Sequence, residues 1–153
     1  MSEDQLKDMV HGKKVYKTEL VRKYTTFLSK YPRIFSDLIS GFNFDFAIYN
    51  SIEEYDLGSP LDVFHVYGNG HSIELKPGRA TDSDLELALS VQAVEKLIQT
   101  KSEEEYTHLL GYFFNEPDEK KGWIDFILHK RTQTIIDMGY GKFAQTAGIL
   151  NND

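Results

Sequence analysis

The feature that most constrains the fold is the dipeptide Asn69-Gly70, which lies between two runs of alternating apolar and polar residues. This dipeptide favours a two-residue type I′ turn, because both central positions of such a turn take positive φ. A turn here pairs Val66 with Ile73 and His65 with Glu74. Because side chains alternate along a strand, the apolar residues then share one face. The sequence therefore predicts a β-hairpin around this turn.

Three further segments alternate with the same period of two, which is typical of strands with one buried face. They are residues 42–48, 85–89 and 123–129. Together with the hairpin they predict five strands. We expect all five to form an antiparallel sheet with helices covering one face, which is an α+β architecture.

Apolar residues recur at three- and four-residue steps elsewhere in the chain and predict amphipathic helices. Ser90 and Ser102 are each followed by such a pattern and are suitable N-caps. Pro32 is expected to end the first long pattern, and residues 51–60 are expected to be a connecting loop. The expected helices are Tyr16–Tyr31, a turn near residues 34–39, segments after Ser90 and after Ser102, Arg131–Asp137 and Phe143–Leu150.

The length of 153 residues suits one domain of average size. We expect a single domain over residues 1–153, with an N-terminal helical segment at 1–40 and the sheet plus helices at 42–150. The chain has no cysteine, which excludes disulfides and a thiolate site. The longest uncharged stretch, Val63–Ile73, is far shorter than the roughly 20 apolar residues of a membrane-spanning helix. The acidic start does not resemble a signal peptide, so we expect a cytoplasmic protein.

The charge of the chain is unevenly distributed. The net charge of −7 argues against nucleic acid as a partner. Residues 1–33 nevertheless carry eight Lys/Arg against four Asp/Glu, whereas residues 34–153 carry nine against twenty. A basic amphipathic segment on an acidic body can dock a protein partner or make transient contact with a membrane surface. An ordinary solvated helix face explains the same pattern.

Sequence motifs for catalysis are sparse. The chain has no GxSxG nucleophile motif and no glycine-rich phosphate loop, and Gly139-Tyr140-Gly141 is better explained as a helix break. The expected pairing of His65 with Glu74 gives a small hydrolase or metal enzyme as one alternative, although a cross-strand pair on a solvated face is the commoner explanation. We expect no enzyme, no metal site and no cofactor.

The chain is rich in aromatic residues, with ten Phe, nine Tyr and one Trp. Many of them fall on one face of the expected sheet or on the helices that face it. Dense packing of an ordinary core accounts for this pattern. An apolar ligand cavity between sheet and helices accounts for it as well, since small-molecule sites are mostly lined by such residues.

One part of the chain resembles a known family. The alternating segment Asp84–Ser90 ends in Leu-Ser and enters the amphipathic segment Val91–Ile98, which resembles the sterol carrier protein-2 family. That family continues through a helical segment into a strand written roughly Gly-Lys-apolar-Lys-apolar and a C-terminal helix. This chain has Gly122-Trp123-Ile124-Asp125-Phe126 and later Gly139–Ala144. The order of elements is similar from Phe42 to Leu150.

The resemblance implies a tunnel between sheet and helices that takes fatty acyl chains or other lipids, with the C-terminal segment as its lid. We therefore expect non-catalytic binding, and by extension transfer, of an apolar ligand. Docking of a protein partner through the basic N-terminal helix stays open as an alternative. The expected ligand-binding residues are Phe44, Phe46, Phe64 and Leu87 on the sheet, Leu97, Phe113 and Phe114 on the helices, and Phe143 and Leu150 at the lid.

Overall fold

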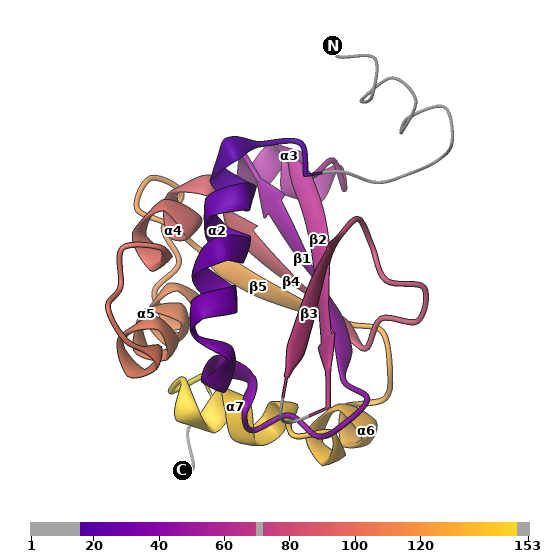
Figure 1. Ribbon diagram of the computed structural model, residues 1–153. Coiled ribbons are helices and arrows are strands. Elements are labelled where there is room, and N and C mark those ends of the chain that lie inside the picture. Colours follow the sequence, from indigo (N-terminus) through magenta and orange to yellow (C-terminus); the bar gives the residue numbers. More distant parts are fainter. Residues whose placement is uncertain (1–15, 70–71, 150–153) are drawn as a thin grey trace, which may run out of the picture.

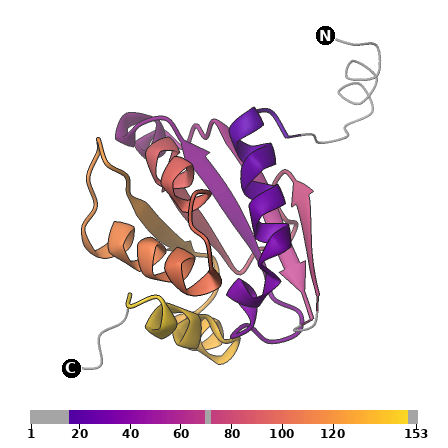
Figure 2. The same ribbon diagram turned by 60° about the vertical axis from the view of Figure 1, so that its left-hand side comes forward.

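The computed structural model describes residues 16–69 and 72–149 of the chain. A five-stranded sheet with the order β3-β2-β1-β4-β5 forms its centre. Most of the helices lie over one face of this sheet or at one of its ends (Figures 1 and 2). The strands are β1 Asn43–Tyr49, β2 Asp62–Gly68, β3 Ile73–Pro77, β4 Leu85–Ser90 and β5 Ile124–Leu128. The α+β class predicted from the sequence is thus confirmed.

Four of the helices begin at a side chain that acts as N-cap, whereas the last two helices begin at Arg131 and Gly139 without a side-chain cap. Thr18, Ser90 and Ser102 each accept a hydrogen bond from a backbone N–H in the first turn of the helix that follows. Ser51 does the same for a short helix in the segment that we expected to be a loop. The helices are α2 Glu19–Lys30, the 3-10 turn η1 Pro32–Phe35, α3 Ile52–Asp56, α4 Val91–Leu97, α5 Glu103–Asn115, α6 Thr132–Asp137 and α7 Tyr140–Thr146.

The sheet is mixed, so the prediction of a wholly antiparallel sheet is wrong. Strands β1 and β4 run parallel, with Phe46 opposite Leu87, while the other neighbours are antiparallel. Parallel neighbours need a long crossover, and here the β2–β3 hairpin and residues 78–84 provide it. Residues 78–84 lead the chain back to the start of β1, where the Asp84 N–H donates to the Asn43 carbonyl at 2.7 Å. Alternation of side chains indicates a strand but not its direction.

The hairpin register also differs from the expected one. Val66 lies opposite Leu75 and His65 opposite Lys76, a displacement of two residues. The Asn69 side chain accepts the Ser72 N–H at 3.2 Å, and this local bond competes with the expected turn. Because the displacement is even, every side chain keeps the face that the sequence predicted. Gly70 of the predicted turn, and residues 1–15 of the predicted N-terminal helical segment, lie outside the described residues.

Most of the core lies between the sheet and α2, α4 and α5. The rings of Phe46 and Phe64 stack with centroids 4.6 Å apart, and Tyr24 of α2 packs edge-on against both. A smaller apolar cluster covers the opposite face, where Tyr49 and Trp123 pack with Tyr55 of α3. The helices therefore do not all lie on one face, because α3 packs on the other.

Candidate ligand-binding cavity

An apolar cavity of about 250 Å³ lies where α5, α6 and α7 meet the sheet. Figure 2 shows α5 and α7 beside the strands on this side of the molecule. Residues from β1, β4 and β5 form its floor, and the three helices form its walls. The lining consists of Leu38, Phe44, Leu85, Leu87, Phe114, Phe126, Leu128, Thr132, Ile135, Ile136, Tyr140, Gly141, Phe143, Ala144 and Ile149.

The cavity wall consists mainly of carbon, and the hydroxyl of its one tyrosine, Tyr140, is bound to a residue outside the lining. The ring of Tyr140 packs edge-on against Phe44 with centroids 5.6 Å apart. Its hydroxyl donates to Asp84 Oδ2 at 2.7 Å. Burial, reinforced by the neighbouring Asp84 carboxylate, raises the pKa of Tyr140 well above its ordinary value. The Tyr140 hydroxyl is therefore neutral and already paired, so that Tyr140 contributes its ring to the lining.

Asp84 joins the elements around the cavity. Its side chain is 1% exposed, and besides the Tyr140 hydroxyl it accepts the Asn43 N–H at 3.0 Å and the Lys130 ammonium at 2.6 Å. These donors come from β1, from the β5–α6 connection and from α7. A buried carboxylate needs several such donors. Asp84 thus fixes α7 against the sheet at the inner side of the cavity.

The mouth of the cavity is marked by exposed aliphatic side chains. Leu128 at the end of β5 is 44% exposed, and Ile136 of α6 is 47% exposed. Both line the cavity. Gly139 breaks the chain between α6 and α7 with φ of 98°, as the helix-break interpretation of Gly139-Tyr140-Gly141 predicted. This break lets α6 and α7 form two sides of one opening.

Four of the nine sequence-predicted ligand residues line this cavity, namely Phe44, Leu87, Phe114 and Phe143. Four others, Phe46, Phe64, Leu97 and Phe113, lie in the core with at most 1% of their surface exposed and are not part of the lining. Leu150 lies outside the described residues. Sequence reasoning missed the contribution of α6 and of Tyr140, although the apolar pair Ile135-Ile136 and the glycine break were visible signals.

The expected contact between His65 and Glu74 is wrong. His65 lies opposite Lys76, and its Nδ1 is 2.8 Å from the Gly78 carbonyl oxygen. Glu74 instead accepts the hydroxyl of Tyr67. Within residues 16–69 and 72–149, no three metal-ligating side chains are grouped closely enough to hold an ion. The alternative of a hydrolase or metal enzyme on this pair therefore lacks its basis.

The alternative of docking through the N-terminal helix required an exposed aromatic stripe. In this stripe Tyr24 and Leu28 are fully buried and Phe27 is 7% exposed. Tyr16, Leu20 and Tyr31 are half-buried and pack against the core. The stripe is therefore mostly used by the core.

No protein-family model, no curated protein and no solved structure matches this chain. None of the helices in the described part of the chain has the length and apolar character needed to cross a membrane.

Proposed function

We propose that the protein binds an apolar ligand, such as the acyl chain of a fatty acid, in the cavity between the sheet and α5, α6 and α7. The observation that carries this proposal is the carbon-lined wall with an exposed aliphatic mouth at Leu128 and Ile136. Membership in the sterol carrier protein-2 family, on the resemblance of residues 84–98 and 122–144, is part of the same proposal.

The chemistry of the wall favours a hydrocarbon over water as the occupant. Water in a cavity needs two to four polar partners, and apolar cavities lined by Leu, Ile and Phe stay dry. A hydrocarbon that fills the space removes the apolar wall from water, which contributes about 25 cal/mol for each Å² of apolar surface. This preference of the wall for a hydrocarbon over water supports a binding or carrier role.

The volume favours a chain of medium length. At about 30 Å³ for each water-sized group, a cavity of this volume holds roughly eight carbon atoms. Burial of each methylene contributes about 0.8 kcal/mol, which is about a fourfold change in Kd. Affinity should thus rise steeply with chain length until the cavity is full. Longer chains would leave their remaining carbons at the mouth.

The test is a calorimetric titration of the full chain with linear fatty acids of six to sixteen carbons. We expect Kd to fall about fourfold per carbon up to roughly eight to ten carbons and then to level off. Ala144→Phe fills the cavity from α7 and should abolish binding. Lys142→Phe adds the same ring at an exposed position of the same helix and serves as the matched control.

Absence of binding for every chain length would refute the proposal. So would unchanged binding in Ala144→Phe, provided that this variant unfolds in a cooperative transition like the parent. Loss of binding in both variants would show that an added ring on α7 is disruptive in itself. Leu85→Phe, from the floor of the cavity, then decides the question, because it fills the space from the sheet and leaves the sequence of α7 unchanged.

A further inference from the structure

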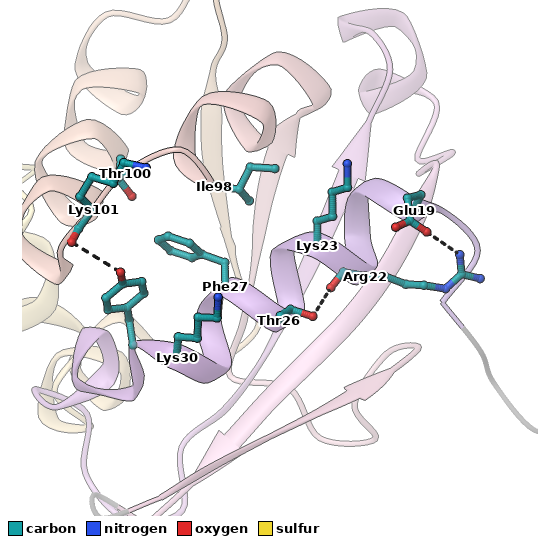
Figure 3. A pocket seen from close by; sticks show the side chains of 10 residues that line it. Glu19, Arg22, Lys23, Thr26, Phe27, Lys30, Ile98, Thr100 and Lys101 are labelled. Atoms are coloured by element: carbon teal, nitrogen blue, oxygen red, sulfur yellow. Dashed lines mark hydrogen bonds and ion pairs between the residues drawn. The ribbon is translucent and has the colours of Figure 1, made fainter.

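A second concavity of about 430 Å³ lies between α2 and the connection from α4 to α5 (Figure 3). Lys23, Phe27 and Lys30 are spaced by four and three residues and therefore occupy one face of α2. Ile98 and Lys101 lie across from them, as the close-up shows. This groove is separate from the apolar cavity, and none of its residues contributes to the lining of that cavity.

The rim of the groove is cationic although the whole chain has a net charge of −7. Four of its lining residues carry a positive charge and one, Glu19, a negative charge. Glu19 is neutralised by Arg22 at 3.4 Å, and Arg22 also donates to the Tyr16 carbonyl oxygen. The ammonium groups of Lys23, Lys30 and Lys101 have no hydrogen-bond or ion-pair partner among the described residues.

Part of the base of the groove is apolar, where Phe27, Tyr31 and Ile98 lie beside Thr26 and Thr100. The rings of Phe27 and Tyr31 pack with centroids 4.9 Å apart, and Ile98 is half-buried beside them. The Tyr31 hydroxyl donates to the Lys101 carbonyl oxygen at 3.5 Å, which ties α2 to the α4–α5 connection. The groove thus combines a partly apolar base with three ammonium groups at its edge that have no partner within residues 16–69 and 72–149.

We propose that this groove binds a small organic phosphate, namely a phosphate monoester attached to an aromatic or short aliphatic group. The dianionic phosphate would accept hydrogen bonds from Lys23, Lys30 and Lys101, because lysine binds phosphate as a mobile point charge. The carbon part would lie on Phe27 and Ile98. A concave site of this volume is within the range of small-molecule pockets, whereas a polyanion or a membrane is contacted by an extended surface.

The test measures binding of phenyl phosphate and of inorganic phosphate to the full chain by two-dimensional amide NMR at low salt. We expect saturable shifts at Phe27, Ile98 and Lys101, with phenyl phosphate binding at least roughly tenfold more tightly because it also covers the apolar part of the base. Lys23→Gln combined with Lys30→Gln should weaken phenyl phosphate roughly tenfold or more. Lys17→Gln combined with Lys120→Gln removes the same charge outside the groove and should change binding little.

An equal loss in the control pair would mean diffuse attraction to positive charge and would overturn the proposal. Equal affinity for the two phosphates would show that the apolar base of the groove does not contribute to binding. This result would also overturn the proposal. A third arm tests sedimentation with phosphatidylglycerol vesicles. Vesicle binding that needs Lys23 and Lys30, without saturable binding of phenyl phosphate, would identify these lysines as a surface contact instead. The result is independent of fatty-acid binding, which uses other residues.

Discussion

The hydroxyl oxygens of Tyr24 and Tyr106 lie 2.5 Å apart in the interior, where they link α2 to α5. Both side chains are at most 1% exposed. Each hydroxyl has the other as its hydrogen-bond partner, and apolar side chains surround the pair. This hydrogen bond therefore fixes the position of α2 relative to α5 within a layer that is otherwise filled by apolar side chains.

Removing one of these hydroxyls should destabilise the protein more than removing both. Tyr24→Phe leaves the Tyr106 hydroxyl buried without a partner, which costs about 1–3 kcal/mol. In the double variant with Tyr106→Phe neither hydroxyl is left unpaired, so the second substitution should recover part of the loss. The free energy of unfolding in urea measures this for the parent, both single variants and the double variant. Additive losses would contradict the interpretation of a mutually satisfied pair.

Stability should fall above about pH 10. Burial raises the pKa values of Tyr24, Tyr106 and Tyr140 above their ordinary value of 10.0. These tyrosines release protons in the unfolded state near that pH but hold them in the folded state. The folded state then binds more protons, and the free energy of unfolding decreases as pH rises by up to about 1.4 kcal/mol per pH unit for each tyrosine.

This dependence can be assigned to the buried phenols with variants. Urea unfolding at pH 8, 10 and 11 should show a smaller decline in the double variant of Tyr24 and Tyr106 than in the parent. Tyr112→Phe removes a phenol that is 51% exposed and should leave the decline unchanged. An identical slope in the parent and the double variant would assign the decline to other groups.

Asp84 should be far more important for stability than its neighbour Asp82. Both carboxylates face Lys130, at 2.6 and 3.6 Å from its ammonium group, but the Asp82 side chain is 88% exposed and that of Asp84 1%. Asp84→Asn should lower the free energy of unfolding by about 1–3 kcal/mol, because it replaces an acceptor of three buried or half-buried donors by an amide. Asp82→Asn should change it by less than about 0.5 kcal/mol. Similar losses would show that Asp84 acts only as surface charge.

The Asp84 cluster also shows how far sequence reasoning reaches in this chain. The alternation of Leu85 and Leu87 predicted the strand, and Ser90 predicted the start of α4, but both faces of β4 are buried and not only the one that carries the leucines. These are local signals with a local physical cause. That Asp84 accepts the Tyr140 hydroxyl depends on a contact between residues 56 positions apart. Neither the period nor the composition of the sequence encodes such a contact.

The same limit explains why four of the predicted ligand residues line the cavity whereas four others lie in the core. Phe44 and Phe46 both project from the same face of β1, so alternation assigns them the same role. In the structure Phe46 is covered by Tyr24 and Phe64, whereas Phe44 reaches the cavity beside Tyr140. Where helices leave space depends on their lengths and angles over the sheet. The sequence pattern therefore predicts the apolar layer but not the position of a void within it.

Enlarging the cavity should shift the preferred ligand length. Leu87 lines the cavity and is 2% exposed, and Leu97 is buried in the core outside the lining. Leu87→Ala and Leu97→Ala should each lower the free energy of unfolding by about 2–5 kcal/mol, since both remove buried methylene groups. Only Leu87→Ala adds its volume to the ligand site, so only this variant should move the plateau of affinity to chains about two or three carbons longer. Saturating ligand should also restore more stability to Leu87→Ala than to Leu97→Ala, because binding to the folded state alone raises stability. A common shift in both variants would mean that general loosening, and not the shape of this cavity, sets the ligand length.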